Sequence, residues 1–351
     1  MNFKKFIGTF ACIILIVSGI CYNQTSVVSR NFEFTYSVIF KPTNGKKFEA
    51  WIPYPQTNEV QNISNVRIKT DLDYKILDEE THGNKYIYLY SSNGLQAQSS
   101  FDLVFKVSRE EHSITKYSNV NEFNYLSGSL QVLVGNAFEN IIDENLLTDS
   151  DIKGVYDFVK KGMHYGKPTS RDNIYFNEPW LSNDELYGLK QVSRDDVLKY
   201  YQDAEKSGSM YTFGNGSSMY ACDIGVGNCT DYHSYFMSLC RTMDVPSRFH
   251  MGFSIPNGNE GEIKGYHCWA DYYVDSLGWA PVDISEADKN PNMADYFFGT
   301  VCENRVEFMV GRDFVLKNYN AGKVNIFIYP LLEVDDVKSS NFSKSFYYKN
   351  L

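Results

Sequence analysis

The run from Gly227 to Pro246 constrains the fold of this chain most strongly. Its aromatic and apolar residues recur at intervals of three and four, which predicts a helix with one face in a core. These residues are Tyr232, Tyr235, Phe236, Leu239, Cys240 and Met243. Cys229 lies one turn before this stripe, where the free backbone N–H groups and the dipole of a helix stabilise a thiolate. The pattern therefore predicts a cysteine of lowered pKa at a helix N-terminus.

A histidine and an aspartate follow on predicted strands. The residues around His267 are aromatic and β-branched, and Asp283 lies in the next predicted strand, after a turn at residues 275–278. Antiparallel strands joined by a tight turn are neighbours, so we expect the two side chains to approach each other. Cys229, His267 and Asp283 would then be nucleophile, general base and the group that orients the base. We predict that Asp283 accepts a hydrogen bond from Nδ1 of His267, leaving Nε2 to face the sulfur.

Each candidate also has a purely structural interpretation. Cys229 could be a buried thiol, His267 a satisfied histidine of an aromatic strand, and Asp283 a turn or capping residue. The three types in this order at these positions favour the catalytic interpretation.

Three other residues near the cysteine also have predicted roles. His233 lies one helical turn from the thiol, and we interpret it as structural rather than as the base. Asp231 is predicted to cap the first turn. The backbone N–H of Cys229 is placed to bind an oxyanion, and the adjacent Asn228 is a candidate for the second donor.

Three segments together resemble the transglutaminase-like superfamily, whose papain-like core carries a Cys-His-Asp triad in this order. The segments are Gly227–Arg248, Tyr266–Tyr273 and Gly278–Asp283. The resemblance covers residues 150–315 and implies an α+β fold in which helices pack on an antiparallel sheet. It also implies Cys229, His267 and Asp283 as the catalytic residues. A loose match to the upstream tryptophan of some members offers Trp180 as an alternative to Asn228 for the second oxyanion donor. Members of the superfamily include crosslinking transglutaminases, cysteine peptidases, deglycosylating amidases and inactive scaffolds.

The expected function is that of an exported cysteine enzyme. It would act on amide bonds of proteins or peptides through a thioester, with hydrolysis favoured over crosslinking. The alternative is a catalytically inactive binding or scaffold protein of the cell envelope, although inactive relatives normally lose the cysteine or the histidine. A third hypothesis is a metal site, which would use Cys222, Cys229, His233, His267 and Cys268. Their spacings match no common zinc pattern, so we expect no metal and no cofactor.

The first 21 residues have the pattern of a signal peptide. Lys4 and Lys5 precede an apolar run that ends in small and polar residues. We expect a secreted, periplasmic or cell-envelope protein, with membrane attachment only if this segment stays uncleaved.

Four further regions are predicted after the signal peptide. Alternating apolar residues with Asn-Gly turns predict an N-terminal β-sandwich-like domain at 31–108. A connecting segment follows at 109–149, then the transglutaminase-like domain at 150–315 and a C-terminal strand extension at 316–351. Within the last two, we predict helices at about 151–165 and 193–207, and strands at 306–310 and 324–332.

The net charge restricts the kinds of molecule that the chain could bind. The formal net charge is −10, and no basic stripe is present, which argues against a nucleic-acid partner.

Of seven cysteines, five lie beyond the export segment: Cys222, Cys229, Cys240, Cys268 and Cys302. They could form two bridges and leave one free thiol, or stay unpaired. Cys240 falls on the apolar stripe and is predicted to be a buried small hydrophobe.

Overall fold

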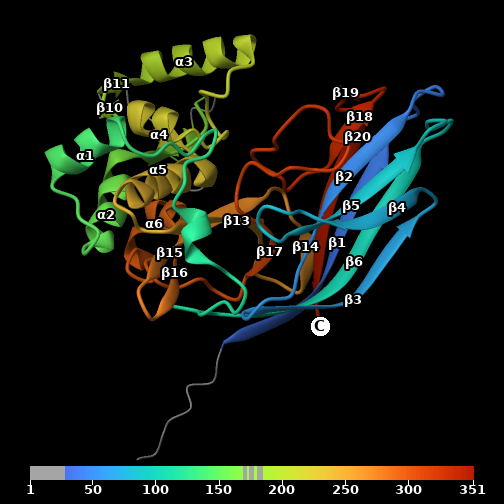
Figure 1. Cartoon of the computed structure of the whole chain (residues 1–351), viewed down its shortest axis with the longest axis horizontal. Helices are drawn as coiled ribbons and strands as arrows, with labels where there is room; N and C mark the ends of the chain where they lie inside the picture. The colour runs from blue at the N-terminus through green and yellow to red at the C-terminus, as the bar shows by residue number, and fades with distance from the viewer. Residues whose placement is uncertain (1–27, 169–171, 174–177, 180–184) are drawn as a thin grey trace, which may run out of the picture.

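The computed structural model describes residues 28–168, 172–173, 178–179 and 185–351, which form two lobes (Figure 1). One lobe is a sandwich of two antiparallel sheets, and the other packs helices on a four-stranded antiparallel sheet. The predicted α+β class is therefore confirmed. The predicted signal peptide at 1–21 and Trp180 lie outside the described residues. No helix among the described residues is long and apolar enough to cross a membrane.

The sandwich has two five-stranded sheets. The first has the order β14 (Glu260–Glu262), β20 (Phe342–Asn350), β1 (Ser29–Phe40), β6 (Ser99–Glu110) and β3 (Gln61–Thr70). The second has the order β19 (Val337–Lys338), β18 (Leu331–Val334), β2 (Phe48–Tyr54), β5 (Lys85–Ser91) and β4 (Asp73–Asp78).

Alternation along the strands builds the core of the sandwich. Phe32, Phe34 and Tyr36 are fully buried on β1, with more exposed residues between them. Phe34 pairs with Phe105 across β1 and β6, and their rings stack with centroids 5.4 Å apart. The predicted strand pattern in residues 31–108 is thus observed, because alternate side chains of a pleated strand point to one face.

The last part of the chain completes both sheets of the sandwich. β20 pairs with β1 along its length, and β18 pairs with β2. β14, a short strand that lies between β13 and β15 in the chain, pairs with the outer edge of β20. These pairings were not predicted, and the predicted strand at 324–332 is wrong for residues before 331, where β18 begins. The predicted domain boundaries stay a prediction.

The second lobe is built around the sheet β16 (Gly278–Val282), β15 (His267–Val274), β13 (Ser247–Ser254) and β17 (Arg305–Val310). Its helices are α1 (Ala137–Asn145), α2 (Ile152–Gly162), α3 (Arg194–Ser207), α4 (Ser218–Ile224), α5 (Cys229–Thr242) and α6 (Ile284–Lys289), with short 3-10 turns at Glu122–Tyr125 and Pro291–Met293. Two-residue strands pair β7 (His164–Tyr165) with β12 (Val226–Gly227), β8 (Asp172–Asn173) with β9 (Glu178–Pro179), and β10 (Leu186–Tyr187) with β11 (Val192–Ser193).

Side-chain caps fix where the helices of this lobe begin. Asp151 caps α2 and Ser193 caps α3, which confirms both predicted helices. α5 begins at Cys229 because Asn228 and Asp231 form a capping box around its first turn.

Helix α5 lies at the centre of its lobe. We predicted one buried face, but every residue from Cys229 to Arg241 is buried. The side of the helix opposite the apolar stripe carries polar residues, which are buried with their hydrogen bonds made. One such bond runs from Ser234 Oγ to the carbonyl of Thr230 at 2.7 Å. A helix buried on all sides is a rigid support for a residue at its N-terminus.

A buried charged cluster joins the two lobes. Arg248 on β13 pairs with Asp271, and its guanidinium carbon lies 4.1 Å from the ring centroid of Trp279. The ring of His250 lies between Asp271 and Glu307, with Nδ1 2.7 Å from Glu307 Oε2. Gln61 of β3 hydrogen-bonds the main chain of Glu307 on β17. The sandwich is thereby tied to the strand next to β13.

Candidate active site

Cys229 is the first residue of α5 and is 3% exposed. The strand β12 leads the chain to it, and a side chain at Gly227 would have its Cβ only 2.6 Å from the Cβ of Asp231. The carboxylate of Asp231 accepts hydrogen bonds from the backbone N–H groups of Gly214, Gly216 and Asn228 at 2.8–3.0 Å. Burial raises the pKa of Asp231 to about 7. The predicted capping role of Asp231 is confirmed, and the residue also holds a loop behind the nucleophile.

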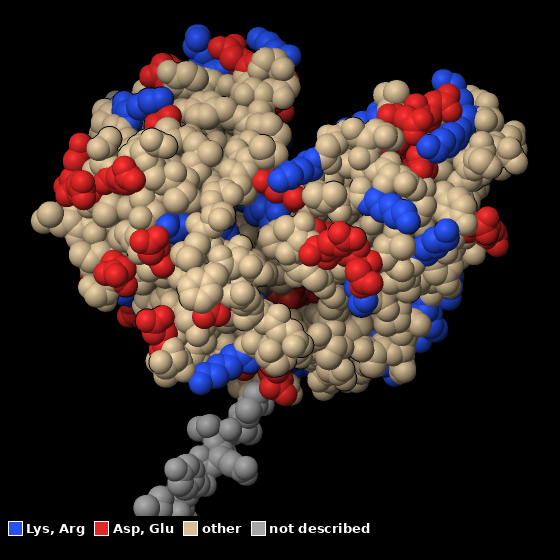
Figure 2. Space-filling view, viewed as in Figure 1, with Lys and Arg blue, Asp and Glu red and all other residues tan. Residues whose placement is uncertain are grey.

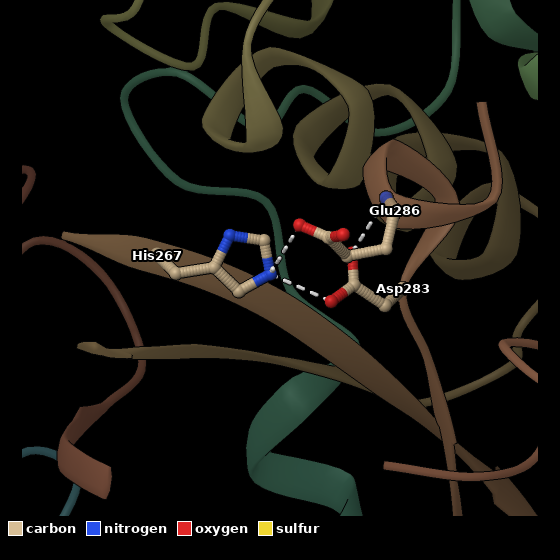
Figure 3. A group of neighbouring side chains, drawn as sticks. All are labelled: His267, Asp283 and Glu286. Carbon is tan, nitrogen blue, oxygen red and sulfur yellow. Dashed lines mark hydrogen bonds and ion pairs between the residues drawn. The ribbon is translucent and has the colours of Figure 1, made fainter. Parts of the chain in front are cut away.

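His267 and Asp283 meet at the edge of the sheet, as predicted (Figure 3). His267 begins β15, and Asp283 directly follows β16. The imidazole Nε2 lies 2.6 Å from Asp283 Oδ2, so the predicted contact through Nδ1 is wrong. The pairing of β15 with β16 stops at Ala270, three residues short of His267. Asp283 therefore lies beyond the paired part of β16, and its carboxylate contacts Nε2, the ring nitrogen of His267 farther from the main chain. Nδ1 is the nitrogen left for the cysteine.

Asp283 both orients the histidine and caps a helix. Its Oδ1 accepts hydrogen bonds from Ser285 Oγ at 3.0 Å and from the N–H of Glu286 at 3.1 Å, at the start of α6. Arg305 on β17 reaches Oδ2 at 3.1 Å. Burial would raise the pKa of Asp283, but the charges and hydrogen bonds of His267 and Arg305 hold it well below its usual range. The carboxylate is therefore fixed in its ionised form.

Electrostatics at the site favour a thiolate beside an imidazolium. The hydrogen bond from Cys268, followed by that of His267, lowers the pKa of Cys229 well below its usual range against the effect of burial. Burial disfavours the charged form of His267, but Asp283 outweighs it and raises the pKa of the imidazole to about 9. Between these two values the cysteine is ionised and the histidine carries a proton.

The other residues that the sequence singled out near Cys229 make contacts that stabilise the fold. Asn228 Oδ1 caps α5 through the N–H of Thr230 at 2.9 Å, and its Nδ2 lies 3.4 Å from the hydroxyl of Tyr266. Both ring nitrogens of His233 bond to main-chain groups, in agreement with its predicted structural role. The five described cysteines are all free, and Cys240 is fully buried as predicted.

Among the described residues, no group of three or more possible metal ligands within 4.8 Å of one another contains Cys222, Cys229, His233 or Cys268, so the alternative zinc set is not assembled. Cys222 lies beside Asp223, and burial raises the pKa of its thiol. A different group, His267, Asp283 and Glu286, has ligand atoms within 4.8 Å of one another (Figure 3). Its two carboxylates already pair with Arg305 and Lys289. This group is an ion-pair network in which the negative charges have protein partners.

The sequence did not place three residues beside the proposed triad: Arg305, Glu286 and Cys268, the last considered only as a zinc ligand or a disulfide partner. Cys268 follows His267 directly, but a strand neighbour is expected on the opposite face. Arg305 lies 22 residues beyond Asp283 on a strand whose register the sequence does not fix. Glu286 stands three residues after Asp283, a spacing that an aspartate N-cap could have indicated.

The structure thus brings together the first residue of α5, Cys229, the first residue of β15, His267, and the buried carboxylate of Asp283. Residues 190–284 match the family model of the transglutaminase-like superfamily, so this part of the chain is similar to a transglutaminase-like core. The match includes Cys229, His267 and Asp283.

Three known proteins are similar to the chain over most of its length. An uncharacterized protein of Haemophilus influenzae is 22% identical over 360 residues, which cover 90% of this chain and 89% of that protein. The structure of a candidate cysteine protease from Cytophaga hutchinsonii aligns with a TM-score of 0.49 and 11% identity over 92% of this chain and all of that one. The periplasmic domain of TgpA from Pseudomonas aeruginosa, bound to ethylmercury, aligns with a TM-score of 0.32 and 14% identity over 76% and 78%.

Proposed function

We propose that this chain is an exported cysteine enzyme that cleaves amide bonds of proteins or peptides through a thioester on Cys229, with hydrolysis favoured over transfer to an amine. The observation that carries the proposal is the 2.6 Å contact between His267 Nε2 and the buried carboxylate of Asp283, because it leaves Nδ1 to the thiol. Secretion, or a periplasmic or cell-envelope location, belongs to the same proposal and rests on residues 1–21.

The proposed reaction has two stages. The Cys229 thiolate attacks the amide carbonyl, and the oxyanion forms near the backbone N–H of Cys229 at the positive end of α5. The imidazolium of His267 gives its Nδ1 proton to the departing amine, so the C–N bond breaks and a thioester remains. The now neutral imidazole takes a proton from water, which attacks the thioester, and the acid product leaves with the thiolate and imidazolium restored.

One face of the molecule suits a polypeptide better than a nucleic acid. The face in Figure 2 is hollowed between the two lobes, and its basic residues are interspersed with acidic and uncharged ones rather than joined in a stripe. Phosphate backbones are bound by continuous positive surfaces, which this face lacks.

The first test is selective alkylation with a low dose of iodoacetamide at neutral pH, mapped by mass spectrometry. We expect modification of Cys229 and none of Cys222 or Cys240, since burial raises the pKa of both. These two thiols are internal controls. His267→Ala should suppress the labelling, whereas uniform labelling of all thiols would refute an activated cysteine.

The second test separates the chemical outcomes. Unfolded casein supplies amide bonds, and a fluorescent primary amine supplies the competing acceptor. We expect new peptide termini in excess of incorporated amine, and neither product with Cys229→Ala. If Cys229 reacts with iodoacetamide but neither product forms, the alternative of a binding or scaffold protein is favoured.

A further inference from the structure

His233 bridges the two main-chain segments that carry the ends of the proposed triad. Its Nδ1 lies 2.6 Å from the carbonyl oxygen of Cys229, and its Nε2 accepts a hydrogen bond from the N–H of Ile284 at 3.0 Å. Ile284 directly follows Asp283 and begins α6. The peptide after the nucleophile and the peptide after the carboxylate are thus joined through one imidazole ring.

The two hydrogen bonds fix the protonation state of this ring. A backbone N–H can only donate, so Nε2 must be without a proton, and a carbonyl can only accept, so Nδ1 must carry one. His233 is therefore neutral. It is fully buried, and burial lowers the pKa of its imidazole, although the charges of Asp283 and Cys229 act in the opposite direction.

We propose that His233, in this neutral tautomer, is the positioning residue that holds the Cys229 main chain at a fixed distance from the Asp283–Ile284 peptide. The inference rests on the proposed function, because it assigns His233 to the alignment of that site. The ring does not replace His267 as the base, since both of its nitrogens are occupied by the main chain. Its effect on chemistry is indirect, through the angle at which the thiol meets the imidazole of His267.

The two hydrogen bonds of His233 can form together only while its ring is neutral, so they should be sensitive to acid pH. A proton added at Nε2 would face the N–H of Ile284, so that hydrogen bond would be lost. The groups that face the ring are the Asp283 carboxylate, whose Oδ1 lies 3.9 Å from Nε2, Cys229, and His267, whose charge disfavours a second cation. We expect alignment to fail at acid pH, before the fold itself is lost.

Three variants separate the two bonds. His233→Asn keeps a donor near the position of Nδ1, His233→Gln keeps an acceptor near that of Nε2, and His233→Ala removes both. The readout is the second-order rate constant for alkylation of Cys229 by iodoacetamide from pH 4 to 9, with folding followed by circular dichroism. We expect the alanine variant to react about ten- to a hundred-fold more slowly than the unchanged chain, and the two amide variants to fall in between. His112→Asn, at a partly buried histidine whose main chain pairs with Val301, is the matched control and should be unchanged.

A second measurement decides the case if the variants unfold or if Cys229 proves unreactive. In ¹⁵N-histidine-labelled protein at pH 7, His233 should show a protonated Nδ1 and an unprotonated Nε2. An imidazolium, or a proton on Nε2, would overturn the proposal. So would an unchanged alkylation profile in a folded His233→Ala variant. Alkylation of Cys229 no faster than that of Cys240 in the unchanged chain would instead refute the proposed function, and the tautomer would still decide the role of His233.

Discussion

Replacing Cys268 with alanine tests how the thiolate of Cys229 is stabilised. The hydrogen bond from Cys268 is the largest influence that lowers the pKa of Cys229, ahead of the contact with His267. A thiol is a weak donor, so this hydrogen bond contributes at most about 1.5 kcal/mol. One pKa unit corresponds to about 1.4 kcal/mol, so losing the bond should raise the pKa of Cys229 by up to roughly one unit.

The assay is the pH dependence of alkylation by iodoacetamide. The acid limb of the profile reports protonation of the thiolate, and in Cys268→Ala it should move to higher pH by that amount. Cys268→Ser retains a donor at this position and should move less. Cys240→Ala is the matched control, because it removes another fully buried thiol from the same lobe. An unmoved acid limb in Cys268→Ala, or an equal displacement in Cys240→Ala, would refute the reasoning.

Two further predictions concern pH. Since the pKa of His267 is raised to about 9, amide hydrolysis should decline above that pH as the proton for the departing amine is lost, while alkylation of the thiolate should not; parallel alkaline limbs would contradict this assignment. Glu307→Gln should lower the free energy of unfolding in urea by about 1–3 kcal/mol. The pKa of His250 is raised because the charges of Asp271 and Glu307 outweigh the effect of burial. The loss of unfolding free energy caused by Glu307→Gln should therefore be greatest below pH ~6.5 and become smaller at higher pH. Glu33→Gln, at a partly exposed glutamate, is the control. If Glu307→Gln loses the same free energy of unfolding at pH 6 and at pH 9, the prediction is contradicted.

The sequence predicted that His267 and Asp283 approach each other, but not the atoms through which they meet. Residue type, order and helix position led to Cys229, His267 and Asp283 as candidates, and the structure brings His267 and Asp283 to 2.6 Å. The nitrogen that makes this contact was predicted wrongly. Spacing along a hairpin places two residues near each other, but the ring orientation depends on where the β15–β16 pairing stops.

The strand pattern was predictable because it is local, and the pairing of the last strands was not. Alternation on β1 and β6 can be read from residues 31–108 alone. The partner of Phe34 on the other side of β1 is Tyr348, more than 300 positions away in the chain. Similarly, the apolar stripe of α5 indicates one buried face, whereas the polar side becomes buried through contacts with Arg312 and Tyr266 from distant segments.

The place of β20 between β14 and β1 determines the order in which the molecule can be completed during synthesis. Residues 229–283 emerge before residues 342–350, so all three proposed catalytic residues are made while one edge of β1 still lacks its partner. An unpaired edge rich in phenylalanine and tyrosine is a template for association with other chains. Pairing over such a sequence separation is also slow. During synthesis there is therefore a period in which the three proposed catalytic residues are already made but the sandwich is incomplete. That period ends when β20 pairs with β1.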